Sequence, residues 1–161
     1  MLILREIKQP GKHSSIFSRY LKPIAYVKPN EEVIIHIVDG LDNLITSETD
    51  IPSEILGNLN PLTGPLYIKG AEPGDTLVVE IIDILPARDW AVSMLIPYMG
   101  GLTTTESTAM LHKPLPEKVW IYELKDGMLT NNERLSFPWS PLLGTIGTAP
   151  EMEALSSLTP Y

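Results

Sequence analysis

The density of chain-breaking residues constrains this sequence more than any other feature. Fifteen prolines and eleven glycines are spread over its 161 residues. Proline removes a backbone donor and fixes φ, and glycine weakens helix interiors, so no window remains for a long amphipathic helix. Runs of β-branched residues recur between these breakers, as is typical of strands. We therefore expect a mainly β fold with under about a fifth of its residues in helix.

The strand predictions rest on runs bounded by Pro, Gly, Asn or Asp. The run Leu77–Leu85 is apolar in both alternating sets, which predicts a central strand covered on both faces. Asp126-Gly127 follows another run and favours a two-residue hairpin turn. The pattern predicts an antiparallel β-sandwich or barrel-like sheet with short helices. The five predicted strands are Ile24–Lys28, Val33–Val38, Leu66–Lys69, Leu77–Leu85 and Val119–Leu124.

Helix is expected only in short pieces. Asp50 is suited to cap a turn that runs through Glu54 to Leu56, and the Thr103–His112 stretch is long enough for two turns. The sequence shows no internal repeat and no linker. We therefore expect a single β-rich domain over residues 1–161.

Charge and cysteine content exclude several classes of protein. The chain has 12 basic and 20 acidic residues, a net charge of −8, so we expect neither nucleic acid nor an anionic membrane as a partner. It has no cysteine, which excludes thiolate metal sites and thiol nucleophiles within it. The first apolar run is too short for a signal peptide, and none reaches membrane-spanning length, so a cytoplasmic location is expected.

The segment NPLTGPLYIKGAEPGDTLVVEI, Asn60–Ile81, describes a rigid loop between two strands. Pro61 and Pro65 fix φ on either side of Gly64, and Pro73–Asp75 forms a turn. This segment resembles the central signature of the acetamidase/formamidase family. Further similarities flank it in the family's order: His13, Phe17-Ser18, Lys22-Pro23, Val27–Pro29, Asp39, Asn43, Leu143–Glu151 and Ser156–Pro160.

The resemblance also shows two kinds of departure. Asn60 stands where many members have His, and Leu44 stands where an amide side chain is common. Family members are about twice as long and continue into a Gly- and His-rich segment and later Asp, His and Glu motifs. The resemblance therefore implies the amino-terminal half of a larger α+β amidase fold.

Two candidate catalytic residues come from the early part of the chain. Asp39 follows an apolar strand, in a group with Asp42 and Asn43 whose oxygens suit a ligand or substrate-orienting role. A polar turn that closes the strand is the alternative. The resemblance places His13 at the amide site as a proton-transfer group or ligand, and a surface histidine is the alternative. By contrast, the alternation around His36 favours a packed or edge imidazole.

The signature loop supplies most of the substrate-binding candidates. Glu72 and Asp75 frame the loop, where a carboxylate suits orientation of an amide, although Asp75 is equally suited to accept backbone N–H groups of its own turn. The resemblance implies substrate contacts from Asn43, Asn60, Thr63, Gly64 and Glu72, and metal contacts from Asp39 and His13.

The function implied is hydrolysis of the C–N bond of a small linear amide, such as formamide or acetamide, to ammonia and a carboxylate. Without cysteine, a metal-bound water is the economical nucleophile, so we expect a divalent metal, zinc, with most ligands outside this chain. We also expect association, as a homo-oligomer or with a complementary carboxyl-terminal chain, because the apolar segment Leu143–Gly147 exposes an edge. The alternative is a non-catalytic β-sandwich that serves as a binding module or structural subunit.

Overall fold

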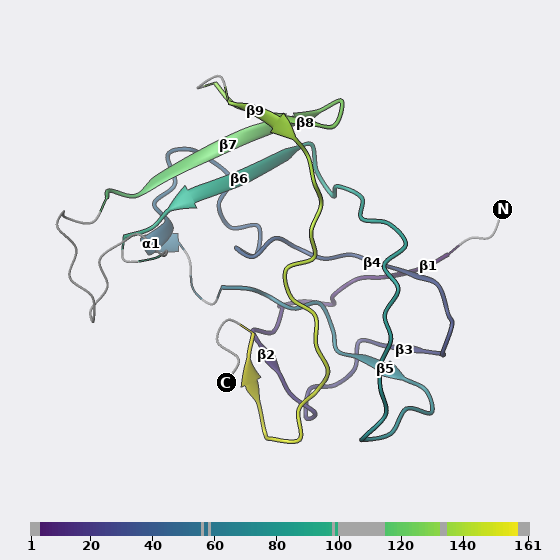
Figure 1. The fold of residues 1–161 in the computed structure, drawn as a ribbon. Helices are drawn as coiled ribbons and strands as arrows, with labels where there is room; N and C mark the ends of the chain where they lie inside the picture. The colour runs from purple at the N-terminus through teal and green to yellow at the C-terminus, as the bar shows by residue number, and fades with distance from the viewer. Residues whose placement is uncertain are drawn as a thin grey trace. The chain divides into compact units, whose positions relative to one another are not determined.

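The computed structural model consists mainly of short strands (Figure 1). It describes residues 4–55, 57, 59–97, 99, 115–132 and 135–157. In this part of the chain the helix is a single four-residue turn, and the sheets do not close into a barrel. The mainly β prediction is confirmed. The elements are β1 (Arg5–Ile7), β2 (Ile16–Phe17), β3 (Ala25–Val27), β4 (Val33–Ile35), α1 (Pro52–Ile55), β5 (Leu66–Ile68), β6 (Trp90–Leu95), β7 (Lys118–Lys125), β8 (Met128–Thr130), β9 (Ser136–Pro138) and β10 (Leu155–Ser156).

The chain divides into two compact units. Unit 1 comprises Met1–Asn43, Asn58–Leu85 and Leu142–Tyr161, and unit 2 comprises Leu44–Gly57 and Pro86–Pro141. None of the helices among the described residues has the length and apolar character needed to cross a membrane. Whether the chain behaves as one domain stays a prediction.

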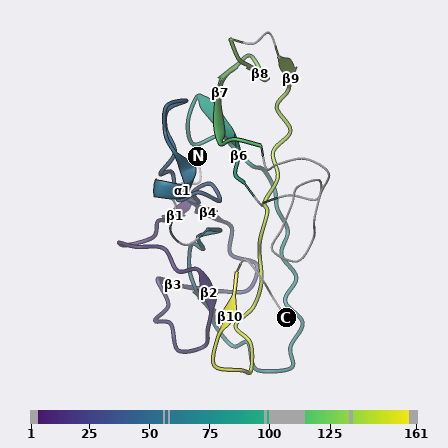
Figure 2. The same ribbon diagram turned by 90° about the vertical axis from the view of Figure 1, so that its left-hand side faces the viewer.

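Unit 1 contains three two-stranded sheets. β1 pairs with β4 and β3 with β5, both in parallel, while β2 and β10 are antiparallel and lie side by side in Figures 1 and 2. The core forms around Ile7, Ala25 and Val27, because alternate residues of β3 point inward while Tyr26 between them points outward. The predicted strands at 24–28, 33–38 and 66–69 are confirmed, each with a shorter paired region.

Unit 2 contains an antiparallel sheet in the order β6-β7-β8-β9. Asp126 and Gly127 join β7 to β8 with φ values of 49° and 73°, the left-handed region that this hairpin turn requires. The hairpin prediction and the strand at 119–124 are confirmed. The buried residues of this sheet are Val119, Tyr122 and Leu129.

The predicted cap of α1 is wrong. The Oδ2 of Asp50 accepts hydrogen bonds from the Thr46 and Ser47 amides at 2.8 and 3.0 Å, so it closes the preceding turn. The Oε2 of Glu117 instead accepts from the Ser53 amide in the first turn of α1, at 2.9 Å. Leu56 and the second helix prediction, Thr103–His112, lie outside the described residues.

The prediction of a central strand at Leu77–Leu85 is also wrong. This segment is extended but belongs to no strand pair, and most of its apolar side chains are exposed. The reason is that none of the described strands lies beside it to complete a sheet. An apolar pattern indicates that a strand is suited to burial, but it does not supply the neighbour that buries it.

Candidate active site

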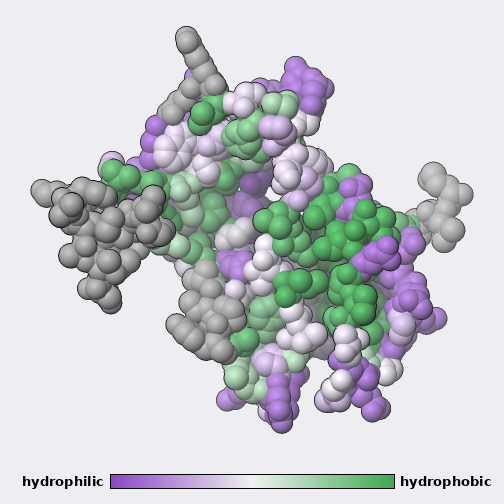
Figure 3. Space-filling view, in the orientation of Figure 1, coloured by the Kyte–Doolittle hydropathy of each residue, from purple (hydrophilic) through white to green (hydrophobic). Residues whose placement is uncertain are grey.

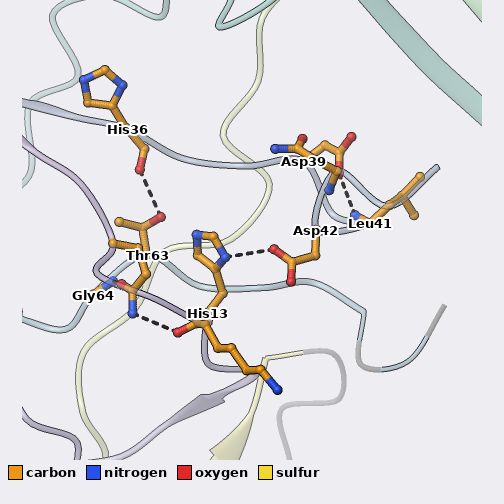
Figure 4. A network of polar contacts seen from close by, with 10 residues as sticks. His13, His36, Asp39, Leu41, Asp42, Thr63 and Gly64 are labelled. Carbon is orange, nitrogen blue, oxygen red and sulfur yellow. Dashed lines mark hydrogen bonds and ion pairs between the residues drawn. The ribbon is translucent and has the colours of Figure 1, made fainter. Parts of the chain in front are cut away.

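A tight turn after β4 holds the first group of candidates. The Oδ1 of Asp39 accepts hydrogen bonds from the amides of Leu41 and Asn43 at 3.0 and 2.9 Å (Figure 4). Asp42 and Asn43 both have φ of 56°, a region that Asp and Asn tolerate better than most residues. The Asp39 carboxylate thus stabilises this turn, in agreement with the alternative that residues 39–43 form a polar turn. Asn43 contributes its backbone amide to one of these hydrogen bonds.

The same turn presents Asp42 to His13. The Nδ1 of His13 lies 2.8 Å from the Oδ1 of Asp42, and 15% of the His13 side chain is exposed (Figure 4). The residue after His13, Ser14, bridges Leu62 of the signature loop, because the Leu62 amide donates to the Ser14 carbonyl at 2.7 Å. His13 is therefore held between the turn and the loop. With a proton on Nδ1 donated to Asp42, Nε2 presents its lone pair as a base, an acceptor or a metal ligand.

Asn60 joins three segments of unit 1. Its amide donates to the carbonyl of Gly40 at 2.8 Å, and its Nδ2 donates to the Thr145 Oγ1 at 2.9 Å and to the Ser157 carbonyl at 2.7 Å. The Ser157 hydroxyl in turn donates to the Asn60 carbonyl at 2.7 Å. The side-chain donors of this predicted substrate-binding residue thus bind the protein itself.

Thr63 and Gly64 lie on the same loop and contact its neighbours. The Thr63 hydroxyl donates to the carbonyl of His36 at 3.1 Å, and the Gly64 amide donates to the Oε1 of Gln9 at 3.0 Å. Gly64 has φ of 136°, a conformation that is strained for other residues. Gln9 was missed by the sequence reasoning, since a lone glutamine in an early strand-to-loop segment carries no distinctive signal.

Glu72 is not brought to this group by any contact that the structure describes. It is exposed in the turn 72–75, where its amide donates to the Oδ2 of Asp75 at 2.9 Å and its carbonyl accepts from the Asp75 amide at 3.1 Å. The Asp75 carboxylate therefore accepts a hydrogen bond from a backbone N–H of its own turn. This agrees with the alternative, stated above, that Asp75 stabilises the turn.

His36 occupies the edge position that the strand pattern favours. Its Nε2 lies 3.0 Å from the Oε2 of Glu6, and 44% of its side chain is exposed. The hydrogen bond from His36, followed by that from Lys8, lowers the pKa of Glu6 below its ordinary value. This second histidine–carboxylate pair is thus an exposed surface pair.

The described residues do not form a metal shell. No group of three or more His, Asp or Glu side chains suited to a metal ion occurs in the part of the chain that the structure describes. His13 and Asp39 therefore do not fit a complete site by themselves, since protein zinc sites use three or four ligands. Two hollows in unit 2, of about 270 and 460 Å³, are lined by none of the candidate residues.

A mainly β chain with a histidine–aspartate pair beside a Pro- and Gly-rich loop matches one family along nearly its whole length. Residues 7–159 match the acetamidase/formamidase family, and the chain belongs to it. A relative from Schizosaccharomyces pombe is 33% identical over 138 residues, which cover 81% of this chain and 32% of that protein. The formamidase of Methylophilus methylotrophus is 34% identical over 80 residues, 48% of this chain and 20% of that enzyme.

Solved structures agree with this assignment. The acetamidase from Yersinia enterocolitica is 32% identical and superposes with a TM-score of 0.80 over 98% of this chain, which is 49% of that protein. The chain thus spans about half the length of the solved acetamidase, and less of the curated relatives.

Proposed function

We propose that this chain contributes His13 and Asp42 to an active site that hydrolyses the C–N bond of a small linear amide. The observation that carries the proposal is the close contact between these two side chains, in a member of a family whose relatives are named formamidase and acetamidase. The His13 imidazole is largely shielded from solvent, so its tautomer is set by Asp42 rather than by water.

The proposed reaction uses His13 as the proton-transfer group. Nε2 takes a proton from the attacking water as its oxygen bonds to the amide carbon, and Asp42 stabilises the imidazolium that forms. The proton passes to the leaving nitrogen as the C–N bond breaks, which gives ammonia and a carboxylic acid, and the acid then loses its proton to become the carboxylate. Asp39 contributes to catalysis indirectly, because the hydrogen bonds that it accepts hold the turn that carries Asp42.

The expected zinc ion requires donors from outside the described residues. When bound, such a metal would supply a water of lowered pKa and polarise the amide carbonyl. Because the proposed proton transfer uses Nε2 of His13, Asp39 is the one of the two expected ligands that remains a proposed metal donor from this chain. The proposal also includes a cytoplasmic location and assembly, either as a homo-oligomer or with a complementary carboxyl-terminal half. A structural or binding subunit without activity is the competing function.

The test uses the chain fused to the part of the Yersinia enterocolitica acetamidase outside the matched half. We expect this fusion to release ammonia from formamide or acetamide, and His13→Ala to lower kcat/KM by at least about 100-fold, a typical loss for a general base. His36→Ala is the matched control, since it removes the other histidine that is paired with a carboxylate. Equal activity of His13→Ala and the unsubstituted fusion would overturn the role of His13. An inactive but folded fusion would favour the subunit alternative.

A further inference from the structure

The segment 77–85 of unit 1 exposes an unusual amount of apolar surface. We call its six exposed apolar side chains the apolar strip: Leu77 (46% exposed), Val78 (83%), Val79 (51%), Ile81 (53%), Ile82 (70%) and Leu85 (76%). In Figure 3, hydrophobic side chains gather on the face over which this segment runs. Exposed apolar side chains that are concentrated on one segment indicate an interaction site more often than scattered surface leucines do.

The backbone of the same segment is also available. Among the described residues, no strand pairs with 77–85. The one hydrogen bond described for an amide of this segment runs from Ile84 to the neighbouring carboxylate of Asp83, at 2.8 Å. The chain is extended here, so successive side chains point to opposite sides. An extended backbone with free N–H and C=O groups and apolar residues on both sides fits the middle of a sheet, with strands added at its edges.

The length of the solved acetamidase points to what covers this surface. The chain superposes on the Yersinia enterocolitica acetamidase over 98% of its own length but only 49% of that protein. About half of that acetamidase therefore has no counterpart among the matched residues, while the extended segment 77–85 has no neighbouring strand among the described residues. A second copy of this chain is a poorer occupant, because it would bring the same net charge of −8, and the same Glu80 and Asp83, against the strip.

We propose that the apolar strip is the docking edge for the other half of the acetamidase fold, which adds a strand to the backbone of 77–85. The partner strand presents apolar residues to the strip and basic residues to Glu80 and Asp83. This inference deepens the association included in the proposed function, but it rests on the family and the exposed strand rather than on catalysis.

The test measures docking without using activity. The 161-residue chain is co-expressed with the unmatched half of the Yersinia enterocolitica acetamidase, and hydrogen exchange is followed residue by residue. We expect a one-to-one complex in which the amides of 77–85 exchange at least about tenfold more slowly than in the chain alone. The double substitution Val78→Asp with Ile82→Asp should weaken the complex at least tenfold without unfolding the chain, because both side chains are mostly exposed.

Met152→Asp is the matched control, since Met152 is 52% exposed in another segment of unit 1. This variant should bind as the unsubstituted chain does. Three results would overturn the inference: no complex, a complex that the double substitution leaves unchanged, or self-association that protects 77–85 without the added half. The fusion described above gives a second readout. Protection of 77–85 in an inactive fusion would support the docking edge while the proposed function fails.

Discussion

Asn60 shows how a residue expected at the substrate can instead hold the fold together. It adopts φ of 57° and donates from Nδ2 to Thr145 and to Ser157. Asn60→Ala removes both of these hydrogen bonds and leaves two partly buried acceptors, the Thr145 hydroxyl and the Ser157 carbonyl, without the Asn60 donor. We expect a loss of about 1–3 kcal/mol in the free energy of unfolding, measured by urea titration.

Asn30→Ala is the control for that experiment. Asn30 has φ of 60°, so it carries the same backbone preference, and the described structure shows no hydrogen bond from its side chain. The difference between the two variants isolates the Asn60 bonds. Equal losses would mean that backbone strain, and not the bonds to Thr145 and Ser157, accounts for the effect.

Asp42 was predicted only as a member of the group 39–43, as a ligand or substrate-orienting residue, and not as the partner of His13. The group 39–43 predicted a polar turn or a site, but which carboxylate faces His13 depends on φ values of 56° at Asp42 and Asn43. Sequence alone does not fix those angles. Likewise, the acceptors for the Asn60 side-chain amide belong to residues more than eighty positions away along the chain, and no local pattern brings them together.

The role of Asp42 can be tested by Asp42→Asn in the fusion with the Yersinia acetamidase half. The amide cannot enforce the tautomer that leaves Nε2 of His13 unprotonated, so we expect kcat to fall about 10- to 100-fold with little change in KM. Steady-state kinetics with formamide measure both constants. If KM rises while kcat is kept, Asp42 binds substrate and does not position His13.

At the scale of elements, the hairpin after β7 depends on its glycine. Gly127 has φ of 73°, and a Cβ at this position meets nothing within 4 Å. Gly127→Ala therefore introduces backbone strain without a clash, and we expect a loss of about 1–2 kcal/mol in stability. Gly57→Ala in the same unit has equal space without a positive φ and should be neutral. Thermal unfolding of the two variants compares them directly.

Elements were predictable where local chemistry decides them. The Asp-Gly turn and the strand at 24–28 are each encoded within a few residues, so both were predicted. The cap of α1 was not, because it comes from Glu117, 64 positions from Ser53. The prediction of a strand at 77–85 was wrong for a related reason. The apolar pattern indicates that the segment can form a strand in a sheet, but pairing requires neighbouring strands, and none is present among the described residues.

The contact between Glu117 and α1 gives stability a pH dependence. Hydrogen bonds from Ser53 lower the pKa of Glu117 below its ordinary value. A depressed pKa means that the contribution is present above the unfolded-state pKa and is lost as pH falls through the folded-state pKa. We expect Glu117→Gln to reduce the acid sensitivity of unfolding. Glu151→Gln, for which the structure describes no side-chain hydrogen bond, should leave it unchanged.

At the scale of the whole molecule, the inventory of reactive groups is small. The chain has three histidines and no cysteine. One of the two described histidines is paired at an exposed edge with Glu6, and the other, His13, is paired with Asp42. A hydrolytic site needs a base, an activated water and donors for the oxyanion. Among the described residues, His13 is the proposed base, and no group is proposed for the other two tasks.

We therefore expect the 161-residue chain alone to have little or no activity on formamide or acetamide. Activity should appear when the unmatched half of an acetamidase is supplied, because that half brings the missing donors and covers the apolar strip. Ammonia release, measured before and after the half is added, tests this with one preparation. Asp39→Ala should lower the restored rate, since the turn that carries Asp42 loses the acceptor for its Leu41 and Asn43 amides. Ordinary enzymatic rates from the chain alone, abolished by Asp39→Ala, would instead place a complete active site within these residues.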